Sequence, residues 1–134
     1  MALQLESPAA AQWSRAQYEA AFSHAGPQRV VLVIEDEHGA AGFVAALAVN
    51  HEWEIENLVI AFASRRRGLA TRLVRELVET AQQEGAAVLL LEVRESNRTA
   101  RAFYEKLQFT EIGRRPGYYH QPEEDAILYR RELK

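Results

Sequence analysis

The sequence contains no cysteine among its 134 residues. This absence excludes disulfides, zinc sites built on cysteine and a cysteine nucleophile. It fits a reducing compartment, and we expect a cytoplasmic protein. Long apolar runs are missing as well: the longest, residues 86–91, is far shorter than the ~20 residues that a membrane span requires. The first residues show no basic leader or apolar core of a signal peptide, so we expect no membrane partner.

The sequence also has no excess of basic residues over acidic ones. The 16 Lys and Arg residues are outnumbered by 19 Asp and Glu residues, which gives a formal net charge of -3. Because a nucleic-acid-binding domain is usually basic overall, this balance argues against a nucleic-acid partner. The four histidines show no metal-ligand spacing, so we expect no metal. We find no repeat or linker, and we expect a single domain over residues 1–134.

The apolar pattern predicts an α/β chain in which strands and helices alternate. The unit from residue 55 to residue 93 reads strand, helix, strand, which predicts a parallel crossover. Its second strand is almost continuously apolar, as is typical of a strand buried on both faces. Strands are expected at residues 29–35, 42–49, 53–61, 87–93, 109–112 and 126–130, and helices near 9–22, 68–84 and 97–107.

Three consecutive arginines, Arg65, Arg66 and Arg67, precede the central helix, which is expected to start near Gly68. The first N–H groups of a helix lack internal acceptors, and the helix dipole adds positive charge there. Gly68 lets a ligand approach the backbone, and the small Ala70 leaves the next turn uncrowded. The pattern predicts a phosphate site at a helix start, although a solvated basic helix start is the alternative. It matches neither the P-loop nor the dinucleotide fingerprint.

Residues 65–70 (RRRGLA) resemble the pyrophosphate loop, Arg/Gln-x-x-Gly-x-Gly/Ala, of the GNAT family of acetyl-CoA-dependent N-acetyltransferases. Residues 91–97 (LEVRESN) and 103–107 (FYEKL) resemble the second half of that family's signature. Residues 114–119 (RRPGYY) and 124–128 (EDAIL), with Trp13 and Ser14, resemble the RimI-type branch, the ribosomal-protein-alanine N-acetyltransferases. The resemblance covers roughly residues 10–130.

The resemblance implies an acyl-CoA N-acyltransferase fold, a mixed and mostly antiparallel sheet flanked by helices. Few residues precede Trp13, so by the resemblance we expect the family's first strand to be missing here. The exposed sheet edge could then be covered by a second copy of the chain, as in a homodimer. Family members often carry a glycine where this chain has Gln108. If that position is left-handed, the substitution costs up to ~1 kcal/mol.

The resemblance also assigns cofactor contacts. Backbone groups of the third strand would bind the pantetheine arm of acetyl-CoA, and N–H groups at the helix start would hold its pyrophosphate. Asn97 would contact the cofactor, or alternatively would only cap the helix that follows. The implied cofactor-binding residues are Leu58, Val59, Ile60, Arg65, Arg66, Arg67, Gly68, Leu69, Ala70, Thr71 and Asn97.

Two residues match the family's proton-transfer positions. Glu92 lies in an apolar run, where a carboxylate is seldom placed without a reason. In the RimI-type branch this glutamate is the proposed general base; alternatively, Glu92 reaches solvent or pairs with Arg94 or Arg114. Tyr104 stands where the family places a general acid for the CoA sulfur, or it packs the second helix on the sheet.

Trp13, Tyr118 and Tyr119 would frame the entrance for the acceptor, although paired tyrosines also occur as half-buried sheet aromatics. The expected reaction transfers acetyl to a protein or peptide N-terminal amine. An α-amine of pKa about 8 is far more deprotonated at neutral pH than a lysine amine of pKa about 10.4. One alternative is the same chemistry on a small amine, such as an amino acid, polyamine or antibiotic. Another is a non-catalytic acyl-CoA-binding module.

Overall fold

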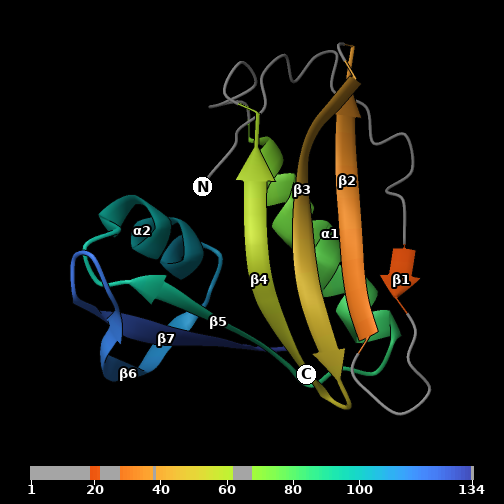
Figure 1. Cartoon of the computed structure of the whole chain (residues 1–134). Helices are drawn as coiled ribbons and strands as arrows, with labels where there is room; N and C mark the ends of the chain where they lie inside the picture. The colour runs from red at the N-terminus through yellow and green to blue at the C-terminus, as the bar shows by residue number, and fades with distance from the viewer. Residues whose placement is uncertain (1–18, 22–27, 38, 62–67, 134) are drawn as a thin grey trace.

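The computed structural model describes residues 19–21, 28–37, 39–61 and 68–133. Its strands form one sheet in the order β1-β2-β3-β4-β5-β7-β6 (Figure 1). The strands are β1 (Glu19–Ala21), β2 (Gln28–Asp36), β3 (Gly39–Val49), β4 (Glu52–Ile60), β5 (Val88–Arg94), β6 (Thr110–Tyr119) and β7 (Glu124–Glu132). The helices are α1 (Leu69–Gln83) and α2 (Arg98–Lys106).

Only the β4–β5 pair of this sheet is parallel, and the other neighbours are antiparallel. Helix α1 connects β4 to β5, which confirms the predicted crossover and the mixed, mostly antiparallel sheet. The predicted strand at residues 109–112 is too short, because β6 continues to Tyr119. There it pairs with Glu124, the first residue of β7.

The N-terminal helix expected at residues 9–22 is wrong over residues 19–21. These residues form β1, which pairs antiparallel with β2 at the edge of the sheet. Pairing with a neighbouring strand, a tertiary contact, overrides the local helical composition that suggested the helix. The rest of that expected helix, Trp13 included, lies outside the described residues.

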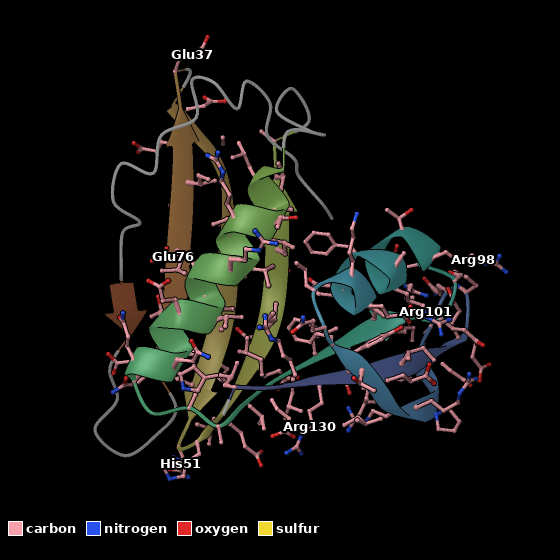
Figure 2. The ribbon with its side chains drawn as sticks, turned by 180° about the vertical axis from the view of Figure 1, so that it is seen from behind. Glu37, His51, Glu76, Arg98, Arg101 and Arg130 are labelled. Atoms are coloured by element: carbon pink, nitrogen blue, oxygen red, sulfur yellow. The ribbon has the colours of Figure 1, made fainter. Side chains whose placement is uncertain are left out.

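Helix α1 covers one face of the strands β2, β3 and β4 (Figures 1 and 2). Its buried side chains repeat at helical spacing: Leu69, Leu73, Val74, Leu77, Val78 and Ala81. They pack in one core with Val30, Leu32 and Ile34 of β2, which alternate with more exposed residues as a strand with one covered face should. Burying each such leucine contributes about 1.5–3 kcal/mol, so this face fixes α1 on the sheet.

Strands β4 and β5 stay together over only three residue pairs, from Glu52–Val88 to Glu54–Leu90. Beyond them the two strands diverge, and β5 runs away toward α2 (Figure 1). A bulge at Glu56 accompanies the divergence, because Ala45 pairs with Asn57 while Ala46 pairs with Ile55. Bulges bend a strand and increase its twist. From residue 55 to residue 60, the β5-facing edge of β4 therefore pairs with no strand in the described part of the chain.

No helix within the described residues is long and apolar enough to cross a membrane.

Candidate active site

Beyond Glu54 and Leu90 the strands β4 and β5 form no pairs, and we call their separation the opening; the end of β4 forms one side of it. Its predicted residues Leu58 and Val59 are half-buried, and Ile60 is fully buried. Their other edge pairs closely with β3: a Cβ added to Gly42 would lie 2.7 Å from the Val59 carbonyl oxygen and from Ile60 Cδ1. The glycine thus permits a tight β3–β4 contact that fixes the end of β4. The free edge of β4 offers N–H and C=O groups to an extended ligand that carries amides.

The second predicted binding element, the start of α1, lies after β4. Gly68 at the N-cap adopts φ 75° and has no side chain that could cap the helix, and the first turn contains no acidic residue. The N–H of Arg72 donates to the Gly68 carbonyl over 3.2 Å. The N–H groups of Leu69, Ala70 and Thr71 come before that bond, so they lack acceptors within the helix and favour an anion. Arg65, Arg66 and Arg67 lie outside the described residues.

Asn97 caps α2, since its Oδ1 accepts a hydrogen bond from the Ala100 N–H over 3.1 Å. The capping role that the sequence suggested is therefore confirmed. Its contact with a cofactor stays a prediction.

Glu92 lies two residues past Leu90, the last residue of β5 that pairs with β4. In the β5–β7 register it sits opposite Leu128. The adjacent Tyr129 points to α2, where its hydroxyl contacts Arg101 and Glu105. Because successive side chains alternate between faces, Glu92 points to the opposite face, away from α2. The sequence suggested no such orientation.

The side chain of Glu92 is 18% exposed and forms an ion pair with Arg115, whose Nη1 lies 3.0 Å from Glu92 Oε2. The suggested partners, Arg94 and Arg114, were wrong. Arg115 shares the face of Glu92 because Gly113, two residues earlier, also pairs with Leu128. Arg114 points to the other face and binds Glu95 and Asp125 instead. Arg94 binds Glu124.

The predicted acceptor residues Tyr118 and Tyr119 lie beside this ion pair. Their rings meet edge to face with centroids 5.1 Å apart. The Arg115 guanidinium lies 4.7 Å from the ring centre of Tyr118, which is 46% exposed. Partial burial raises the pKa of the Tyr119 hydroxyl, and the negative charge of Glu92 raises it further. The structure thus brings Glu92, Tyr118 and Tyr119 together on one face.

Glu54 belongs to the same site, and the sequence analysis missed it. It pairs with Leu90 at the point where β4 and β5 separate, on the face that Glu92 shares. Partial desolvation raises the pKa of Glu54, and the charges of Glu92 and Glu56 raise it further, while Arg115 opposes them. The alternating glutamates of β4 had the pattern of an ordinary solvent-facing strand, so the sequence carried no signal for this role.

Tyr104 is a core residue on α2, only 6% exposed. Its ring lies edge to face with Phe103 at 5.0 Å and with Phe109 at 5.4 Å. Burial raises the pKa of the Tyr104 hydroxyl well above its ordinary value, so the proton stays on the oxygen at neutral pH. Tyr104 therefore packs the helix, as one interpretation of the sequence held. The other interpretation, a general acid for the CoA sulfur, stays a prediction.

A polar network that the sequence did not reveal holds α2 on the sheet. Arg101 Nε donates to the hydroxyl of the fully buried Tyr129 over 3.1 Å, and that hydroxyl donates to Glu105 over 2.7 Å. Arg101 also donates to the Glu95 carbonyl over 3.1 Å. Arg98, one turn earlier, is exposed at the outer end of the helix (Figure 2). The described residues contain no group of three or more His, Cys, Asp or Glu side chains placed to hold a metal ion.

The profile of the Acetyltransferase (GNAT) family matches residues 2–109. The chain belongs to the GNAT family. The family uses acetyl-CoA as its acetyl donor, and its members are N-acetyltransferases. The opening between β4 and β5, with the helix start after β4, is therefore the candidate acetyl-CoA site of a GNAT acetyltransferase.

Relatives within the family narrow the comparison. The chain is 34% identical to the ribosomal protein bS18-alanine N-acetyltransferase of Salmonella typhimurium over 109 residues, which are 80% of this chain and 74% of that enzyme. It is 42% identical to an uncharacterized Mycobacterium leprae protein over 83 residues, 62% of this chain, but spans only 22% of that protein. The structure of the Escherichia coli ribosomal-protein-S18-alanine N-acetyltransferase matches with a TM-score of 0.74 at 30% identity, over 79% of this chain and 70% of that one.

A more distant structure shares the fold only. It is a streptothricin acetyltransferase of Bacillus anthracis in complex with acetyl coenzyme A, 22% identical, with a TM-score of 0.73 over 79% of this chain and 63% of that one.

Proposed function

We propose that this GNAT acetyltransferase transfers the acetyl group of acetyl-CoA to the N-terminal α-amine of a protein or peptide. The observation that supports it most is the place of Glu92, just past the point where β4 and β5 separate. A carboxylate there lies beside two tyrosines, on the face of the sheet that no helix of the described residues covers, where an acceptor can reach the end of the cofactor site. The relatives that act on a ribosomal-protein alanine, by their names, support the choice of an N-terminal amine.

Each residue then has one task. Acetyl-CoA supplies the acetyl group as a reactive thioester. Glu92 accepts the proton of the acceptor ammonium, directly or through a water molecule, because only the neutral amine is a nucleophile. An N–H on the free edge of β4 donates to the carbonyl oxygen on which negative charge develops. Leu58 and Ile60 supply that edge, since the intervening Val59 directs its carbonyl toward β3, and the start of α1 binds the pyrophosphate.

Tyr104 donates a hydrogen bond to the departing sulfur. Because burial raises the pKa of its hydroxyl, Tyr104 acts as a hydrogen-bond donor rather than by giving up its proton. A thiol has an ordinary pKa of about 8.5, so moving the proton fully from a buried tyrosine to a thiolate is uphill. A donated hydrogen bond avoids that cost and still stabilises the leaving group. As the C–N bond forms and the C–S bond breaks, the second proton of the attacking nitrogen passes to the thiolate or to solvent, so the products are the amide and CoA.

The exposed surface around Tyr118 favours a peptide acceptor over a small amine. A site for a small amine is normally a concave pocket that buries most of its ligand. Here Tyr118 is 46% exposed, and Arg115 beside it is 53% exposed. Such a surface suits a chain whose first residue reaches Glu92 while the next residues lie across the tyrosines.

The test is acetyl transfer followed by mass spectrometry, with acetyl-CoA and a mixed panel of acceptors. The panel contains peptides with free Ala, Ser, Met and Gly N-termini, lysine peptides blocked at the N-terminus, free amino acids and polyamines. The proposal predicts modification of the free N-termini alone. Turnover confined to small amines would contradict it, and so would turnover on blocked lysine peptides alone. Binding of acetyl-CoA without turnover on any acceptor would favour a binding module.

A further inference from the structure

The ion pair between Arg115 and Glu92 places a cation on the carboxylate to which we assigned the acceptor amine. Arg115 Nη1 lies 3.0 Å from Glu92 Oε2. The two side chains differ in exposure: Glu92 is 18% exposed and Arg115 is 53% exposed. The carboxylate is thus largely enclosed, and the guanidinium lies on its solvent side. An arriving amine meets Arg115 before it meets Glu92.

Arg115 is held more weakly than the arginines around it. Arg94 donates to Glu124 and to the Pro122 carbonyl, each over 3.2 Å. Arg114 binds both Asp125 and Glu95, at 2.8 and 3.3 Å. Within the described part of the chain, Arg115 hydrogen-bonds a single oxygen of Glu92 and lies on the face of the Tyr118 ring, while Glu54 attracts it without a hydrogen bond. Arg115 is the exposed partner of this single ion pair, so its guanidinium is readily hydrated and can leave Glu92 at small cost when another cation takes its place.

An N-terminal amine reaches the site as an ammonium, because its pKa of about 8 keeps most of it protonated at neutral pH. The ammonium and the guanidinium are both cations and hydrogen-bond donors, so they compete for the same carboxylate. The field that attracts them comes from two carboxylates. Glu54 lies at the β4–β5 junction close enough to Glu92 for each to feel the other's charge.

We propose that Arg115 is the resident counter-ion of Glu92 and that the acceptor ammonium binds by displacing it. This inference rests on the proposed function, since it takes Glu92 as the group that receives the acceptor amine. Arg115 then sets the affinity for cationic acceptors. While Arg115 occupies Glu92 the site is not open to an amine, and the apparent affinity falls by the fraction of molecules in that state. The displaced guanidinium can stay in contact with the face of the Tyr118 ring, on which it already lies.

The experiment measures peptide binding by calorimetry, with the protein saturated with CoA so that no turnover occurs. The probe is a short peptide with a free N-terminal alanine, and the comparison peptide has the same sequence with an acetylated N-terminus. Arg115→Gln should bind the free peptide about two- to fivefold more tightly than the wild type, the scale of one exposed ion pair. It should bind the acetylated peptide as the wild type does, because that peptide has no ammonium.

Arg114→Gln is the matched control, since it removes the same charge from the next residue without touching Glu92. It should leave the affinity for the free peptide unchanged. The tightening by Arg115→Gln should also disappear in a Glu92→Gln background. Equal or weaker binding of the free peptide to Arg115→Gln would overturn the proposal, and so would equal tightening by Arg114→Gln.

These outcomes separate the two claims. The proposed function fails if wild-type protein acetylates no N-terminal amine. The displacement proposal is decided by binding alone, whether or not acetyl is transferred.

Discussion

The hydroxyl of Tyr129 lies 2.7 Å from Oε2 of Glu105 and donates a hydrogen bond to it. Tyr129 is fully buried on β7, and Glu105 belongs to α2, one residue after Tyr104. This bond therefore ties the helix that contains the proposed donor Tyr104 to the strand next to β5. The position of Tyr104 depends on a buried polar contact as well as on apolar packing.

Replacing Tyr129 by Phe tests that contact. The ring stays, but Glu105 and Arg101 lose their shared partner. We expect the free energy of unfolding to fall by about 1–2 kcal/mol, because hydrogen bonds to charged groups contribute more than neutral ones. Chemical denaturation measures it. Tyr118→Phe is the control and should change stability by less than about 0.5 kcal/mol, since Tyr118 is exposed. Equal stability of wild type and Tyr129→Phe would show that the network contributes nothing.

Gln108 has a left-handed backbone, with φ 75°. The sequence predicted a cost in stability at this position if its backbone were left-handed. A residue with a Cβ is strained there, whereas glycine is not. Gln108→Gly should therefore raise the free energy of unfolding by up to about 1 kcal/mol. Gln83→Gly, at the end of α1, should lower it, because that residue is helical. Loss of stability in Gln108→Gly would contradict the strain argument.

Local periodicity was sufficient for most of the fold. The apolar repeat of α1 and the apolar run of β5 each lie within a residue or two of the predicted bounds. The family motifs supplied what periodicity could not, namely the mixed, mostly antiparallel sheet and the expected cofactor contacts of the third strand and the helix start. The error at residues 19–21 arose because each residue of β1 pairs with a residue of β2 that lies eight to twelve positions further along the chain, which local composition does not reveal.

The candidate site was only partly visible in the sequence. Glu92, Tyr118 and Tyr119 were found because they match family positions, and the structure gathers them on one face. Arg115 was overlooked in favour of Arg94 and Arg114. Which arginine reaches Glu92 depends on the β6–β7 register, and that register shifts twice along the pair. Strand alternation decides the contact only after such irregularities are known.

Glu54 gives a prediction about pH. Its pKa is raised in the folded protein, so its ionised form costs stability at pH values above that raised pKa. Below the ordinary pKa of a glutamate it is neutral in both states and costs nothing. Glu54→Gln should therefore be more stable than wild type at pH 7, by a few tenths of a kcal/mol after solvent screening. The difference should shrink as the pH falls toward about 4.

Denaturation of both proteins at several pH values measures this difference. Glu79→Gln, on the exposed side of α1, is the control for simple loss of a negative charge. A Glu54 difference that grows as the pH is lowered would contradict the sign of the effect.

Tyr104→Phe tests whether the hydroxyl of Tyr104 takes part in catalysis or whether the residue only packs α2 on the sheet. The ring contacts with Phe103 and Phe109 remain, so the free energy of unfolding should change by less than about 1 kcal/mol. The rate of acetyl transfer should fall about 100-fold or more, because a donor to the departing sulfur is lost. Binding of acetyl-CoA, measured by calorimetry, should stay within a few-fold of wild type. Full turnover by Tyr104→Phe would leave this residue with a packing role alone.

The most direct test of the account is the turnover of Glu92→Gln on a free N-terminal peptide between pH 6 and 9. The substitution preserves the shape of the side chain but cannot accept the proton of the acceptor. The account predicts a loss of about 100- to 10,000-fold in kcat/KM near neutral pH, with partial recovery as rising pH deprotonates the amine in solution. Glu111→Gln, which pairs with Tyr129 and contacts Arg101 on the α2 side of the sheet, opposite to the face of Glu92, should retain wild-type turnover. Full turnover by Glu92→Gln across the whole range would contradict the central claim that Glu92 is the base.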